Sequence, residues 1–65
     1  MTTQTYPLNK INFLTVDTEE TYNSNYSIIA YDNEGGVWEE KFASSPKEAE
    51  IKAKKMAERI IKEYK

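Results

Sequence analysis

Hydrophobic and polar residues alternate along the chain up to about residue 43, and a helical spacing follows. The alternating pattern, rich in β-branched and aromatic side chains, covers residues 8–17, 26–32 and 37–43. Such a pattern is typical of strands. Residues 33–36, Asn-Glu-Gly-Gly, have the composition of a tight turn. Because short connections favour neighbouring strands, the pattern predicts a three-stranded antiparallel meander.

A single helix is predicted over residues 45–64. Ser45 is a favoured N-cap, and Pro46 suits the first helical position, where its missing N–H has no intrahelical partner. Glu48 stands three residues after Ser45, which is the spacing of a capping box. Apolar side chains then fall on one face, whereas Ile51 falls on the opposite side and is predicted to be exposed. The apolar face comprises Ala49, Ala53, Met56, Ala57, Ile60, Ile61 and Tyr64.

These elements predict an α+β fold in one domain, residues 1–65, with a three-stranded antiparallel meander and one C-terminal helix packed on one face. Apolar residues occur at both alternate sets of strand positions, so the sequence leaves open which face the helix covers. One helix covers only one side of the sheet. Either the first ten residues fold over the other side, or that side is an interface.

Residue composition excludes several kinds of chemistry. The chain of 65 residues contains no Cys and no His, so it lacks disulfides, thiolate metal ligands and the commonest general base. No segment approaches the roughly 20 apolar residues of a membrane span, and the first residues lack the pattern of a secretory signal. We therefore predict a cytoplasmic protein with no membrane partner.

Paired carboxylates are the candidate catalytic groups that the sequence offers. Glu39 and Glu40 are neighbours on a predicted strand, so their side chains point to opposite faces. Glu19 and Glu20 fall in a predicted loop, where solvation is expected. Gly35 and Gly36 are not followed by the Lys-Ser or Lys-Thr of a phosphate-binding loop. The sequence therefore predicts no enzymatic activity, no catalytic residue, no metal site and no cofactor.

Charge is distributed unevenly along the chain. Residues 1–43 hold two basic and seven acidic side chains, a net charge of −5, and residues 44–65 hold seven basic and four acidic ones, a net charge of +3. Part of the basic segment is explained as helix support, because three Glu–Lys pairs have the i, i+4 spacing. These pairs are Glu48–Lys52, Glu50–Lys54 and Glu58–Lys62.

The order of elements resembles those of known families. From Ile11 to Tyr64, three strands and the segment Phe-Ala-Ser-Ser-Pro-Lys-Glu-Ala lead into an alanine-spaced helix. This order resembles the second half of a double-stranded-RNA-binding domain, and it is similar to the small domain of HicB-type antitoxins and to the arm-binding domain of phage integrases. In the RNA-binding family the helix opens with Lys-Lys-x-Ala-Lys, and of those lysines only Lys47 is matched. The resemblance implies a fold and leaves function open.

Two functional hypotheses follow from the charges and the aromatic residues. The leading one is a protein-binding module, acting on another protein or on itself, that resembles small inhibitors carried by phages or mobile elements. Its acidic, aromatic sheet surface would consist of Tyr31, Trp38, Asp17, Glu19, Glu20, Asp32, Glu34 and Glu39. The alternative is binding of double-stranded RNA or DNA through the basic helix face. That face would consist of Lys47, Lys54, Lys55 and Lys62.

Overall fold

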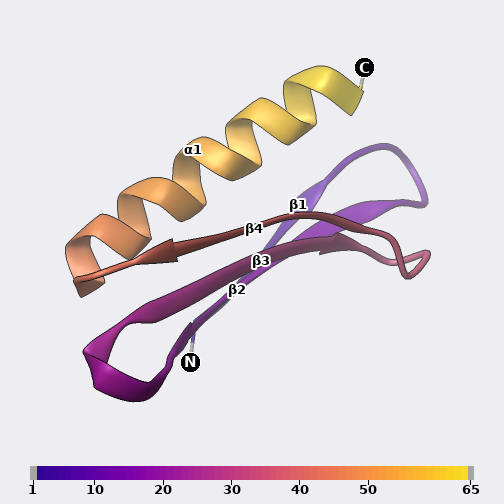
Figure 1. The fold of residues 1–65 in the computed structure, drawn as a ribbon. Coiled ribbons are helices and arrows are strands. Elements are labelled where there is room, and N and C mark those ends of the chain that lie inside the picture. Colours follow the sequence, from indigo (N-terminus) through magenta and orange to yellow (C-terminus); the bar gives the residue numbers. More distant parts are fainter. Residues whose placement is uncertain (1, 65) are drawn as a thin grey trace.

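The computed structural model describes residues 2–64 as a four-stranded antiparallel sheet with one helix on one face (Figure 1). The elements are β1 (Thr2–Pro7), β2 (Phe13–Glu20), a 3-10 turn η1 (Tyr22–Ser24), β3 (Tyr26–Asp32), β4 (Val37–Ala43) and α1 (Pro46–Tyr64). The strands lie in the order β1-β2-β3-β4, which is a meander. The predicted α+β class, antiparallel sheet and C-terminal helix are confirmed.

The predicted number of strands is wrong by one. Residues 2–7 form β1, which pairs with β2 from Thr2 opposite Thr18 to Pro7 opposite Phe13. The first predicted strand, residues 8–17, is instead a turn followed by β2. The sequence of β1, Thr-Thr-Gln-Thr-Tyr-Pro, is polar, so it carries no hydrophobic alternation. An edge strand can form without a hydrophobic alternation, because its backbone hydrogen bonds to the neighbouring strand hold it in place.

The turn between β1 and β2 is built around asparagine. The Asn9 Oδ1 accepts hydrogen bonds from the N–H groups of Ile11 and Asn12, at 2.9 and 2.7 Å. The side-chain amides of Asn9 and Asn12 donate to the hydroxyl of Tyr64, at 2.9 and 3.1 Å. The turn thereby holds the last turn of α1 against the end of the sheet.

The core lies between α1 and the sheet face that carries Leu14 and Ile28, both of which are fully buried. The predicted apolar face of the helix meets this sheet face, and Ile51 is exposed as expected. The opposite sheet face mixes aromatic, polar and acidic residues, so the aliphatic face is the one that the helix covers. The best buried core residues are Leu14, Val16, Ile28, Ala30, Ala49, Met56, Ala57 and Ile60.

The helix begins with side-chain caps close to those predicted. The Ser45 Oγ accepts the N–H of Glu48 at 3.1 Å. The Glu48 carboxylate reaches one residue further back than a capping box requires, accepting the Ser44 hydroxyl at 2.9 Å and the Ser44 N–H at 3.4 Å. Lys52, and then these Ser44 contacts, lower the pKa of Glu48. Two consecutive serines thus share the capping of α1.

One of the three predicted i, i+4 pairs forms an ion pair. The Lys52 Nζ lies 2.9 Å from the Glu48 carboxylate, and it also donates to the carbonyl oxygen of Phe42 at 2.8 Å. Within residues 2–64, neither Lys54 nor Lys62 has a carboxylate within ion-pair distance. Arg59 and Glu63 form a further i, i+4 ion pair at 3.9 Å near the end of α1, whereas the predicted pairs of Lys54 and Lys62 are solvated.

Removing the cap is expected to weaken the fold measurably. Ser45→Ala leaves the N–H of Glu48 without its acceptor and should cost about 1 kcal/mol of unfolding free energy. For a domain of this size, that corresponds to a melting temperature lower by about 4–8 °C. Ser45→Asp keeps an acceptor at the N-cap and serves as the control. Equal losses of melting temperature in both variants would contradict the capping role.

Candidate functional site

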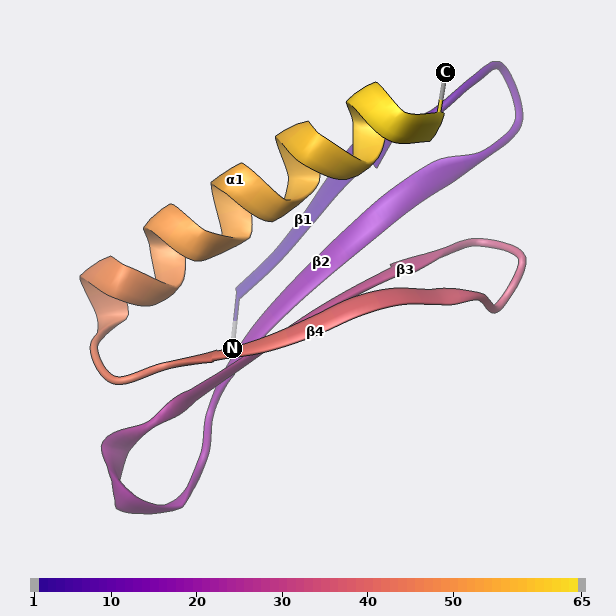
Figure 2. The same cartoon turned by 45° about the horizontal axis from the view of Figure 1, so that its top comes forward.

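The face of the sheet opposite α1, here called the open face, is uncovered. Within residues 2–64 no helix or strand lies over it, as two views of the ribbon show (Figures 1 and 2). Alternation along the strands and the pairing registers place one set of side chains on it. They are Thr3, Thr5, Pro7, Phe13, Thr15, Asp17, Glu19, Ser27, Ile29, Tyr31, Val37, Glu40 and Phe42.

Large apolar side chains on the open face are accessible to solvent. Phe13, Val37 and Phe42 are 42, 69 and 60% exposed, and Ile29 and Tyr31 between them are half-buried. Exposed apolar surface that gathers on one face is a common mark of interaction sites. The three strands β2, β3 and β4 therefore present an apolar strip, which consists of Phe13, Ile29, Tyr31, Val37 and Phe42.

The open face also holds a fixed carboxylate. Asp17 on β2 accepts hydrogen bonds from the Thr3 hydroxyl on β1 and the Tyr31 hydroxyl on β3, each at 2.8 Å. The hydrogen bond to Asp17, together with partial desolvation and the negative charge, raises the pKa of Tyr31. Glu19 and Glu40 lie on the same face, and no Lys or Arg occupies a strand position there. The open face is thus acidic as well as apolar.

The structure divides the predicted acidic and aromatic site. Asp17, Glu19 and Tyr31 lie on the open face. The other five residues lie on the helix side of the sheet or in the turn between β3 and β4; they are Glu20, Asp32, Glu34, Trp38 and Glu39. Strict alternation along residues 37–43 would place Trp38 and Phe42 on one strand face, but the structure puts them on opposite faces.

A β-bulge moves Trp38 to the helix side. The register between β3 and β4 shifts at Ala30 and Tyr31, so that Val37 pairs with Tyr31 and Glu39 with Ala30. Trp38 therefore has no pairing partner on β3 and is the extra residue of the bulge. The Trp38 ring packs 6.0 Å from that of Tyr64, and its indole N–H donates to Asp32 at 2.9 Å. A bulge inserts one residue and reverses the alternation beyond it.

The residues that sequence reasoning missed are Phe13, Val37 and Phe42. Each is apolar and lies on the same face as Tyr31. Their apolar character is visible in the sequence, but strict alternation would put Val37 and Phe42 on opposite faces, so the set is recognised only once the covered face and the bulge are known.

The turn between β3 and β4 is organised by Asp32. The Asp32 carboxylate accepts the N–H groups of Glu34 and Gly36, at 2.9 and 3.0 Å, and the Trp38 indole N–H. Gly35 has a φ of +90°, whereas a Cβ on Gly36 would lie 3.0 Å from the Asp32 carboxylate. Gly35 is therefore needed for its left-handed backbone angle, whereas Gly36 is needed because the Asp32 carboxylate approaches its Cα closely.

Acid is expected to loosen this turn. The hydrogen bonds from Gly36 and then Trp38 lower the pKa of Asp32 below its usual 3.8. A carboxylate with a lowered folded pKa stabilises the fold above its unfolded pKa, and the stabilisation is lost as the pH falls through the folded value. Because Trp38 is the only Trp, its fluorescence should change in this acidic range. The change should be absent in Asp32→Asn, and its persistence there would contradict the assignment.

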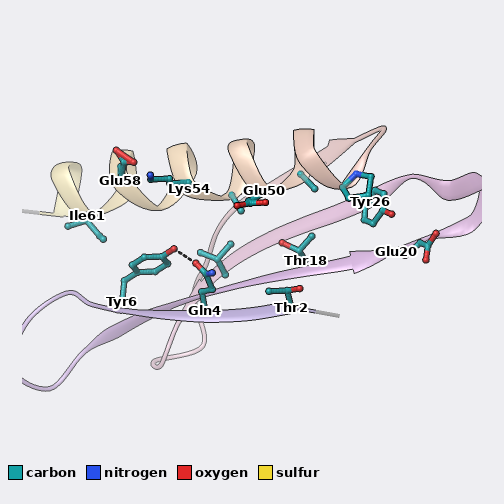
Figure 3. Close-up of a pocket in the computed structure, with 14 residues that line it drawn as sticks. Thr2, Gln4, Tyr6, Thr18, Glu20, Tyr26, Glu50, Lys54, Glu58 and Ile61 are labelled. Carbon is teal, nitrogen blue, oxygen red and sulfur yellow. Dashed lines mark hydrogen bonds between the residues drawn. The ribbon is translucent and has the colours of Figure 1, made fainter.

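A groove runs along the other side of the molecule, between α1 and the β1–β2 edge of the sheet (Figure 3). It has a volume of about 630 Å³, with the buried Val16 and Ala49 among its lining residues. Tyr6 stands below Ile61 at one end, and the Tyr6 hydroxyl donates to the Gln4 side chain at 2.5 Å. On the helix rim, Glu50, Lys54 and Glu58 follow one another at i, i+4 spacing.

The basic face predicted for the helix is also divided. Lys47 and Lys55 flank the exposed Ile51 on the outer surface, and Lys62 is exposed further along α1. Lys54 instead borders the groove between two glutamates. Arg59 is held by an ion pair with Glu39. The outer stripe is therefore Lys47, Lys55 and Lys62.

Comparisons of the chain with models of protein families, with curated proteins and with solved structures find no match. Among residues 2–64, no cluster of acidic side chains is suited to hold a metal ion. Within the same range, α1 lacks the long apolar stretch that a membrane crossing requires. The surfaces described above are therefore the basis for functional inference.

Proposed function

We propose that this protein is a small, non-enzymatic protein-binding module whose open face docks on a basic surface of another protein. The observation that carries the proposal is the exposure of Phe13, Val37 and Phe42 on a face whose charged strand residues are all acidic. The apolar strip would supply affinity through burial. The carboxylates would speed the encounter and reject acidic partners.

The kind of partner follows from the charges around the strip. Asp17, Glu19 and Glu40 present spaced negative charges, and Asp17 is already held in place by two hydroxyl groups. Preformed geometry reduces the entropy lost on binding. A protein surface that binds nucleic acid is rich in Lys and Arg. Docking there would cover the surface, and the protein would then act as an inhibitor of nucleic-acid binding.

A second candidate function is binding of duplex RNA or DNA through the outer stripe. The supporting observation is that Lys47, Lys55 and Lys62 are exposed on one helix and have no ion-pair partner within residues 2–64. Contacts from three lysines would give a salt slope of at most about −3 for duplex DNA, at about −0.9 for each phosphate. The overall charge of −2 opposes such binding.

The test is retention of purified, basic nucleic-acid-binding proteins on the immobilised chain at low salt. The proposal expects that wild type retains at least one of them and that a competing duplex displaces it. The Lys47→Glu/Lys55→Glu/Lys62→Glu variant should retain the same protein, because the stripe lies on the far side of the molecule from the open face.

Two outcomes would overturn this proposal. One is that no basic protein is retained by wild type. The other is that wild type binds the duplex directly, with an affinity that falls as salt rises and is lost in the triple lysine variant. The second outcome would establish the outer stripe as the functional surface.

A further inference from the structure

The two edges of the sheet differ in which backbone groups they offer. The N–H of Leu8 donates to the carbonyl of Asn12, at 2.9 Å, which fixes the alternation of hydrogen bonds between β1 and β2. By that alternation, Gln4 and Tyr6 direct their backbone groups toward β2. The N–H and C=O groups of Thr3 and Thr5 therefore point outward, away from the sheet.

The β4 edge is protected against pairing with another strand. It carries the bulge at Trp38, and its central residues, 39–41, are Glu-Glu-Lys. The carbonyl of Phe42 is already occupied by the side chain of Lys52. Bulges and edge charges are the devices by which natural sheets avoid edge-to-edge pairing.

The β1 edge has neither a bulge nor edge charges, and Pro7 at its end is its only protective residue. Its residues, Thr2–Pro7, include no charged side chain, and its register with β2 runs without a bulge. The helix does not shield it either, because the groove separates α1 from β1 (Figure 3). The outward N–H groups belong to Thr3 and Thr5, which are two residues apart. A new antiparallel strand would pair with groups at this spacing.

We propose that two copies of this chain pair through β1, antiparallel and around a two-fold axis at Gln4. In this register Thr3 faces Thr5 of the second copy, and each of these threonines donates its N–H and accepts through its C=O. The threonine side chains pair across the junction on the open face, as β-branched residues do in stable strand pairs. The two sheets thereby become one continuous sheet.

Pro7 disfavours one alternative register. Sliding the second copy so that Thr3 faces Pro7 would leave the C=O of Thr3 without a donor, because Pro has no N–H. The register centred on Gln4 pairs both the N–H and the C=O of Thr3 and of Thr5. A neutral, self-complementary edge of this kind meets the symmetry requirement of a two-fold interface.

Pairing at β1 also changes the groove. Tyr6 lies opposite Thr2 of the second copy, on the helix side of the sheet. The two grooves would then lie next to each other over the joined strands, with one α1 on each outer side. The apolar strip on β2, β3 and β4 remains free, so dimer formation and partner binding are compatible.

The first measurement is amide hydrogen exchange of the wild-type chain at increasing protein concentration. The N–H groups of Thr3 and Thr5 should exchange more slowly as concentration rises. The N–H of Glu40 on the β4 edge is the internal control, because it points outward by the same alternation and should not change. A concentration-independent rate at Thr3 and Thr5 would overturn the proposal.

The second measurement is sedimentation equilibrium of matched variants. Thr5→Pro removes an outward donor without touching the bonds between β1 and β2, so its mass should fall from that of two chains to that of one. Thr5→Val keeps the donor and the β-branched shape, and it should remain a dimer. Far-UV circular dichroism confirms that each variant is folded.

Three results would overturn pairing through β1: a wild-type monomer at every concentration, a Thr5→Pro variant that stays dimeric, and loss of the dimer in Phe42→Ser alone. The last would place self-association on the open face. If Thr5→Pro fails to fold, Thr3→Lys/Thr5→Lys replaces it. This variant gives β1 the edge charges that β4 has, and it should be monomeric.

Discussion

Replacing Ile60 by Ala is expected to unfold a large part of the protein at 25 °C, whereas Ile51→Ala in the same helix is expected to leave it folded. Ile60 is 2% exposed and packs between α1 and the sheet, and Ile51 is 46% exposed on the outer surface. Truncating a buried Ile typically costs about 2–5 kcal/mol. A domain of this size holds only about 3–5 kcal/mol in reserve.

The comparison is sharp because the two substitutions are chemically identical and lie in one helix. Ala has the higher helix propensity, so Ile51→Ala should be neutral or slightly stabilising. Urea unfolding followed by the fluorescence of Trp38 measures both variants. A similar loss of unfolding free energy in the two would mean that α1 does not pack on the sheet through the face described here.

Phe42→Ser is expected to weaken the binding of a basic partner protein by about 30-fold or more, which corresponds to the roughly 2 kcal/mol of an interface hot spot. Phe42 is large, apolar and exposed at the edge of the open face, so it can enter a pocket of the partner without rearrangement. Its exposure also means that the substitution removes little from the core. Isothermal titration of the retained partner measures the change.

The matched control for this prediction is Tyr22→Ser. Tyr22 is an exposed aromatic residue in η1, outside the sheet, so its loss should leave the dissociation constant unchanged. If both variants weaken binding equally, the open face has no special role. If only the triple lysine variant weakens it, the partner binds the outer stripe instead.

Partner binding should also respond to salt in a characteristic way. The carboxylates of Asp17, Glu19 and Glu40 act at long range, so added salt should slow association more than it speeds dissociation. The apolar contacts made by Phe42 should persist. This separation distinguishes a docked protein interface from phosphate contacts, whose affinity falls steeply with ionic strength.

Local patterns in the sequence determined the second half of the fold. The strands at residues 26–32 and 37–43 have the bounds of β3 and β4, and α1 begins within one residue of its predicted start. The cap at Ser45, the apolar helix face and the exposure of Ile51 were also predictable. Each of these features depends on residues that are near neighbours in the chain, where propensity and periodicity are sufficient.

The tertiary structure alone decided the features that involve function. Pairing with β2 makes residues 2–7 a strand, although they have no hydrophobic pattern of their own. The fit of α1 on Leu14 and Ile28 selects the covered face, and the bulge moves Trp38 away from Phe42. Strand registers depend on contacts between distant segments, and a shift of one residue reverses every side chain. For that reason the acidic surface predicted from the sequence is divided in the structure, and the open face is defined by its apolar strip.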